Sequence, residues 1–117
     1  MTYVDGFILA VPKEKLEAYK EMARIAGDVW KEYGALSYVE CIGDDVPYGK
    51  LTSFPRAVQA TEDEVVAFSW IVYESREKRD EINAKVMADP RLKGGMETMP
   101  FDGKRMIFGG FESFISV

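Results

Sequence analysis

The spacing of hydrophobic residues along the chain changes from every second position to every third or fourth position, and back again. Residues 3–11 are rich in Tyr, Val, Phe, Ile and Leu and predict a β-strand, which Pro12 closes. From Lys13 onward, apolar residues recur at helical spacing with charged residues between them, and Gly34 is a natural helix end. Residues 36–43 predict a second strand.

The second half of the chain repeats this order after a long connection. Residues 44–59 contain two Pro, one Gly and two adjacent Asp, so we expect mostly loop, with room for a short strand at residues 51–54. Residues 64–73 are apolar at both parities and predict a buried strand. A helix capped by Ser75 then runs to Asp89-Pro90, and after a turn at Asp102-Gly103 residues 105–116 predict a last strand.

This β-α-β-β-α-β order predicts a ferredoxin-like α+β fold, with a four-stranded antiparallel sheet and two helices on one face. The 117 residues fit one domain, residues 1–117. Two helices cover only one sheet face, yet both parities of the strands are apolar, so a monomer would expose an aromatic surface. We therefore expect a homodimer in which two sheets pack face to face.

Charge and composition exclude several classes of function. The net charge is −5 and no run of Lys or Arg forms a basic stripe, which disfavours binding to nucleic acid or to an anionic membrane surface. No apolar run approaches the roughly 20 residues that cross a bilayer, and the first residues lack the basic start of a signal peptide. Cys41 is the single cysteine and cannot form an internal disulfide, so we expect a cytoplasmic protein.

The chain contains no histidine, which excludes Ser-His-Asp and Cys-His catalysis as well as His-ligated zinc or haem. Asp44-Asp45 lacks the ligand spacing of an EF-hand, and no GxGxxG sequence is present. We therefore expect no metal and no cofactor.

Seven segments spread over the chain carry a family likeness: residues 3–7, 30–36, 38–41, 52–55, 68–73, 87–91 (Met87-Ala88-Asp89-Pro90-Arg91) and 100–106. They resemble the YbaA-like family of bacterial proteins of unknown function. The resemblance implies a dimeric α/β barrel, in a superfamily that also holds small monooxygenases, muconolactone-type isomerases and haem-degrading enzymes. It implies no activity, and since those relatives often use a His that this chain lacks, their chemistry would transfer by fold analogy alone.

Strand parity gathers one group of candidate residues. The small residues Gly6, Ala10, Gly109 and Ser113 share a parity that suits close packing of helices, so the opposite parity should face the partner. That parity holds three carboxylates among aromatic side chains, and a buried carboxylate needs a partner or a proton. The candidate catalytic residues are Asp5, Glu40 and Glu112, and the candidate substrate-binding residues are Tyr38, Trp70, Phe108 and Arg105.

Two alternatives stay open for these acids. In one they are general acid/base groups in a pocket or bind a hard cation; in the other they pair with Arg105, Lys104 or Arg79, or accept hydrogen bonds from Tyr and Trp. Reversing the helix-facing parity would move them into the crevice between the sheet and its own helices.

Two functions follow from these alternatives. The first is small-molecule binding or cofactor-independent catalysis, monooxygenase- or isomerase-like by fold analogy, in a cavity that holds Asp5, Glu40 or Glu112. The second is a non-enzymatic homodimeric structural or interaction module. In that case each of these acids should form an ion pair, and no cavity should hold them.

Overall fold

Strand β1 (Tyr3–Pro12) pairs along its whole length with β3 (Glu64–Tyr73) at the centre of a four-stranded antiparallel sheet. Strand β4 (Ile107–Glu112) joins the free side of β1, and β2 (Ser37–Ile42) joins the free side of β3, so the strand order is β2-β3-β1-β4. The computed structural model describes residues 1–92 and 99–117.

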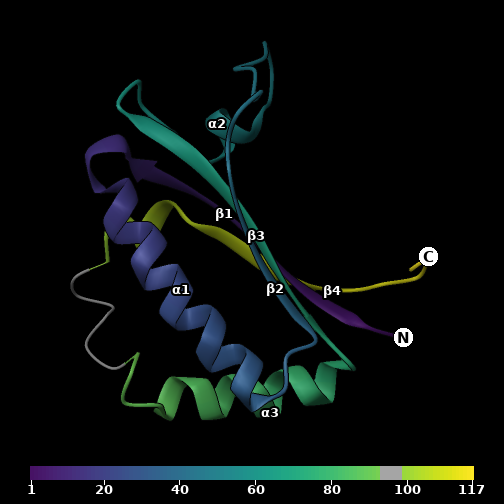
Figure 1. Cartoon of the computed structure of the whole chain (residues 1–117). Coiled ribbons are helices and arrows are strands. Elements are labelled where there is room, and N and C mark those ends of the chain that lie inside the picture. Colours follow the sequence, from purple (N-terminus) through teal and green to yellow (C-terminus); the bar gives the residue numbers. More distant parts are fainter. Residues whose placement is uncertain (93–98) are drawn as a thin grey trace.

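Two helices lie on the same face of this sheet, α1 (Leu16–Tyr33) and α3 (Arg76–Ala88) (Figure 1). A 3-10 turn over Lys13–Lys15 leads into α1, which ends at Gly34 with a left-handed φ of 118°. Ser75 caps α3 by accepting a hydrogen bond from the Lys78 amide. The predicted ferredoxin-like order is confirmed. No helix in the described ranges has an apolar stretch long enough to cross a membrane.

Two predicted strands differ from the structure. The expectation of a short strand at residues 51–54 is wrong: the Ser53 side chain accepts from the Arg56 amide at 3.1 Å and begins the short helix α2 (Phe54–Ala57). The last strand is shorter than the predicted 105–116. It stops at Glu112 because its neighbour β1 begins at Tyr3, and after that only Ser113 continues the pairing, to the Thr2 carbonyl.

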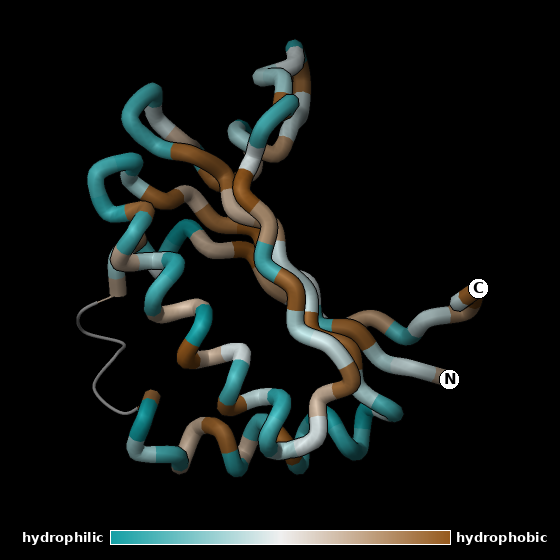
Figure 2. Tube along the Cα trace, in the orientation of Figure 1, coloured by the Kyte–Doolittle hydropathy of each residue, from teal (hydrophilic) through white to brown (hydrophobic). Residues whose placement is uncertain are grey.

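The sheet register divides the side chains between two faces. The helix face packs a core of Leu9, Val11, Ala67, Ile71 and Tyr73 against Tyr19, Ala23, Val29, Ile82 and Val86 of the two helices. We call the other side the open face; its residues are Val4, Gly6, Ile8, Ala10, Pro12, Ser37, Val39, Cys41, Glu64, Val66, Phe68, Trp70, Val72, Ile107, Gly109 and Phe111. Figure 2 shows hydrophobic colour along the strands and alternating polar and apolar colour along α1.

A buried polar group joins α3 to the sheet. The indole Nε1 of Trp30 donates to the Tyr73 hydroxyl and to Asn83 Oδ1, each at 3.1 Å. Tyr73 is fully buried, and its hydroxyl donates to the same Asn83 oxygen at 3.3 Å. These bonds explain why α3 carries a polar residue on the side that faces the core, since each buried polar atom of the group has a partner.

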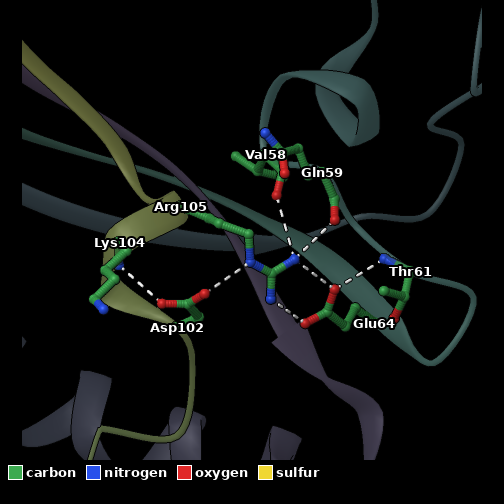
Figure 3. Close-up of polar contacts among 7 residues, drawn as sticks. All are labelled: Val58, Gln59, Thr61, Glu64, Asp102, Lys104 and Arg105. Atoms are coloured by element: carbon green, nitrogen blue, oxygen red, sulfur yellow. Dashed lines mark hydrogen bonds and ion pairs between the residues drawn. The ribbon is translucent and has the colours of Figure 1, made fainter.

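Arg105 ties its own segment, residues 102–105, to residues 58–64 at one end of the sheet (Figure 3). Its guanidinium donates to both Glu64 oxygens, at 3.0 and 2.6 Å, and to Asp102 at 3.1 Å. It also donates to the Gln59 carbonyl at 2.8 Å, just after α2. The Glu64 side chain is only 8% exposed, so its charge depends on this partner. Arg105 therefore has a structural role, and we call Arg105 with Gln59, Glu64 and Asp102 the clamp.

The clamp predicts a pH dependence of stability. Hydrogen bonds from Arg105 hold the pKa of Glu64 at about 2, below its ordinary value of 4.5. A carboxyl whose pKa is lower in the folded chain stabilises the fold at pH values above its ordinary pKa. This contribution is lost as the pH falls from about 5 toward 2. We expect Arg105→Met to lower the free energy of unfolding by about 2 kcal/mol at pH 7, with the difference from wild type shrinking between pH 5 and pH 2.

Urea unfolding of both proteins at several pH values measures this difference. Arg76→Met, which removes an exposed guanidinium at the start of α3, is the control and should show a small difference at every pH. A difference for Arg105→Met that stays constant down to pH 2.5 would contradict the assignment to Glu64.

Candidate functional site

A cavity of about 350 Å³ lies between the helix face of the sheet and the inner side of α1. Aromatic and Met side chains supply most of its wall, with residues 91–92 and 99–106 along one side. This wall includes Phe7, Tyr19, Trp30, Tyr38, Phe101, Met22, Met87, Met99 and Met106. A cavity of this size lies at the lower end of the range for small-molecule sites, and its wall is apolar as such sites usually are.

One carboxylate enters this apolar wall. Glu40 of β2 lines the cavity, where its Oε1 accepts from the Tyr19 hydroxyl at 2.6 Å and its Oε2 accepts from the Tyr38 hydroxyl at 2.9 Å. A carboxylate has about four acceptor positions, so the two tyrosines leave further lone pairs free to accept. The cavity therefore presents a fixed acceptor to whatever occupies it.

Both tyrosines are held as donors. Burial, reinforced by the negative charge of Glu40, raises the pKa of the Tyr19 hydroxyl far above its ordinary value. Burial and the same charge raise the pKa of the Tyr38 hydroxyl in the same direction. Each hydroxyl keeps its proton at neutral pH and directs it to Glu40, which fixes the orientation of the carboxylate.

The sequence of α1 brings Tyr38 into this position. A Cβ atom on Gly27 would lie 3.0 Å from Cδ1 and 3.3 Å from Cε1 of the Tyr38 ring, closer than side-chain carbons normally approach. The ring also packs against Trp30, with 5.9 Å between ring centroids. Gly27 thus lets α1 and β2 approach closely enough for the Tyr38 hydroxyl to reach Glu40.

The chain that follows α3 is anchored beside the cavity. Asp89 accepts from the Tyr33 hydroxyl at 2.7 Å and from the Arg91 guanidinium at 2.9 and 3.0 Å. The hydrogen bonds from Arg91 and Tyr33 hold the pKa of Asp89 well below its ordinary value. Arg91 also binds Glu32 at 2.6 Å. Arg91 and Leu92, which line the cavity, are therefore attached to the end of α1.

Of the three carboxylates predicted from the sequence, the structure places one in the cavity. Asp5 is 6% exposed on the helix face, with Nε of Arg79 at 3.8 Å. Asp5 pairs with Ile71 whereas Glu40 pairs with Ser69 on the far side of β3, so the two acids lie two strands apart. Glu112 is exposed on the edge strand β4.

The first assignment of the strand faces was wrong: the parity that holds Asp5 and Glu40 faces the helices, not a partner. This is the alternative in which the acids lie between the sheet and its own helices. Tyr38 accompanies Glu40 in the cavity. Trp70 pairs with Gly6 and Val39 and so lies on the open face, away from Glu40. Phe108 shares the helix face but is 68% exposed, and Arg105 belongs to the clamp.

Sequence reasoning did not place Tyr19 in the site. A tyrosine at the helical spacing of α1 is expected in the core, and Tyr19 does lie there, 3% exposed. The available signal was its phenol, because a buried hydroxyl needs an acceptor and Glu40 is the acid at that depth. Among the residues that the structure describes, no three His, Cys, Asp or Glu side chains come together as a metal site would require.

Comparison with known proteins identifies relatives over nearly the whole chain. The profile of a family described as "Protein of unknown function (DUF1428)" matches residues 2–103. "Uncharacterized protein YbaA" of Escherichia coli (strain K12) is 60% identical over 115 residues, covering 98% of each chain, and the protein of that name in Shigella flexneri matches equally. The resemblance predicted from the sequence is confirmed.

Solved structures of similar fold are distant in sequence. "Putative antibiotic biosynthesis monooxygenase from Nitrosomonas europaea" has a TM-score of 0.61 at 12% identity, covering 97% of this chain and 90% of that one. Rv0793 from Mycobacterium tuberculosis has a TM-score of 0.61 at 11% identity, covering 99% and 98%. A dimeric ferredoxin-like protein from an uncultured marine organism has a TM-score of 0.59 at 12% identity and covers 100% of each chain. Such low identities show a shared fold alone.

Proposed function

This chain belongs to the DUF1428 family of unknown function, and from its cavity we propose that it binds a small, mostly apolar organic molecule carrying one hydrogen-bond donor. The observation that carries the proposal is Glu40, an acceptor fixed by two tyrosines in a wall that is otherwise apolar except for Ser69 and Arg91. The apolar wall favours an aromatic or aliphatic body, and Glu40 requires a hydroxyl or N–H group on it. A carboxylate in this position can also take a proton from such a ligand, which is the reaction class that the site could support.

A pair of probes that differ only in the donor tests the proposal. We expect 2-naphthol to stabilise the protein in a thermal-shift titration and naphthalene to bind at least about tenfold more weakly, since a hydrogen bond to a charged group contributes about 1.5–3 kcal/mol. Glu40→Gln should weaken binding of 2-naphthol about tenfold, because a neutral amide is a poorer acceptor than a carboxylate. Glu112→Gln, at an exposed carboxylate, is the matched control and should bind as wild type does.

Equal binding of both probes, unchanged by Glu40→Gln, would remove Glu40 from the site. Absence of binding by any phenol, aniline or indole would favour the alternative, a non-enzymatic homodimeric interaction module.

The proposal includes a homodimer formed through the open face. Phe68, Ile107 and Phe111 are 42%, 43% and 65% exposed there, on a face made almost entirely of apolar residues. Covering apolar area releases about 25 cal/mol per Å², and a two-fold contact covers the same face on both copies. The solved relative described as dimeric supports this arrangement. Light scattering should give twice the 13.2 kDa mass of the chain, and a monomer at micromolar concentration would contradict it.

A cytoplasmic location is also part of the proposal. The chain has one cysteine, Cys41, and no second thiol with which it could form an internal disulfide, which fits a reducing compartment.

A further inference from the structure

Residues 44–53, which we call the arm, connect β2 to α2 in a braced conformation. Arg56 donates from Nε to the Tyr48 carbonyl at 3.0 Å and from Nη2 to the Gly49 carbonyl at 3.1 Å. Its guanidinium also lies 4.0 Å from the centre of the Tyr48 ring. Gly49 has a φ of 69°, and a Cβ atom there would meet the Thr52 carbonyl oxygen. These contacts hold the middle of the arm in a defined shape.

The braced arm exposes apolar side chains. Leu51 is 88% exposed and Tyr48 is 58% exposed. Single exposed apolar residues are ordinary, but these two lie three residues apart on a segment whose backbone is held in place. An exposed apolar tip on a braced segment indicates a surface that another molecule covers.

Helix α2, which follows the arm directly, lies on the open-face side of the sheet. Val58, just after α2, packs on Ala10 and Val66 of the open face and covers one end of it. The Phe54 ring lies 5.7 Å from the Phe68 ring, which lies 5.5 Å from Trp70, so an aromatic row runs from α2 onto the open face. Figure 1 shows α2 and the arm extending past the end of the sheet, away from α1 and α3.

We propose that the arm clasps a second copy of this chain, with Leu51 and Tyr48 packing on the partner when two open faces meet. The inference rests on the homodimer proposed above and adds the arm to its interface. Packed sheets lie about 10 Å apart, so an arm that extends from one end of an open face is within reach of the end of the second sheet. In a two-fold dimer both arms make this contact. The interface of each copy then consists of the arm together with the aromatic row on the open face.

Sedimentation over a range of concentrations tests the arm, using three variants of the full chain. Leu51→Asp should raise the dimer dissociation constant at least about tenfold. Ala18→Asp adds the same charge to an exposed position of α1, on the far side of the sheet, and should leave that constant unchanged. Phe111→Glu, at a position 65% exposed on the open face, should give a folded monomer.

The double variant Phe111→Glu/Leu51→Asp separates contacts between copies from contacts within one chain. If Leu51 packs only on the partner, adding Leu51→Asp to the monomer leaves its melting temperature unchanged; a clear fall would show that Leu51 packs within its own chain and overturn the inference. If Leu51→Asp dimerises as wild type does while Phe111→Glu is monomeric, the arm inference fails and the open-face dimer stands. If Phe111→Glu remains dimeric, the open-face dimer itself fails.

Discussion

Substituting Ala26 with Leu is expected to abolish binding of 2-naphthol, lowering its affinity by more than about tenfold, while the fold becomes slightly more stable. Ala26 lies on the inner side of α1, 8% exposed, and lines the cavity. A Leu side chain there would project into apolar space that is empty in the folded chain. Filling such space can add about 1 kcal/mol to the free energy of unfolding, because buried methylene groups leave water.

Thermal unfolding and a 2-naphthol titration of the same samples measure both effects. Ala18→Leu, on the exposed side of the same helix, controls for helix propensity and added hydrophobicity and should change neither quantity much. If Ala26→Leu raises stability and lowers binding, the cavity is a binding site that the fold keeps at the expense of tighter packing. Unchanged binding in Ala26→Leu would place the ligand elsewhere, and a marked loss of stability would show that the cavity cannot accept the side chain.

Replacing Arg79 with Met is expected to lower the free energy of unfolding by about 3 kcal/mol, because it leaves the Asp5 carboxylate buried without its cation. Within residues 1–92 and 99–117, Arg79 supplies the ion pair of Asp5, at 3.8 Å. Arg79 also donates to the Tyr3 hydroxyl at 3.1 Å and lies over the Tyr3 ring, contacts that Met partly retains through packing.

Urea unfolding measures this loss against two further variants. Lys78→Met removes the neighbouring exposed ion pair with Glu81 and should cost less than about 1 kcal/mol. The double variant Asp5→Asn/Arg79→Met should recover much of the stability, since neither charge is then left unpaired. Equal losses for Arg79→Met and Lys78→Met would show that Asp5 does not depend on Arg79, and would return Asp5 to the candidate catalytic groups.

The elements that were predicted most accurately are those with strong local signals. Strand β3 has its predicted bounds of 64–73 because its run of apolar residues is bracketed by turns. Ser75 caps α3 and Gly34 ends α1, as side-chain chemistry and a left-handed backbone dictate. The short helix α2 was missed because it depends on a single capping side chain, Ser53, inside a segment that reads as loop.

The choice of helix-facing parity could not be made from strand alternation, because both parities are apolar. The small residues Gly6 and Gly109 suggested close packing of helices. In the structure they instead lie beside the Phe111 ring on the open face, where Cβ atoms on them would make ordinary contact with the ring at 3.9 and 3.6 Å. The usable signal lay in the helices, since α1 and α3 carry Tyr19 and Arg79 on their inner sides, where they need polar partners on the sheet, which Glu40 and Asp5 supply.

The helix face and the open face lie on opposite sides of one sheet, so the cavity and the proposed dimer contact do not share a surface. In a dimer joined through the open faces, the two cavities lie at the outer surfaces with two layers of strands between them. Ligand can then enter and leave without dissociation of the pair. We expect two ligands per dimer, taken up independently, so that the binding curve has a Hill coefficient of about one.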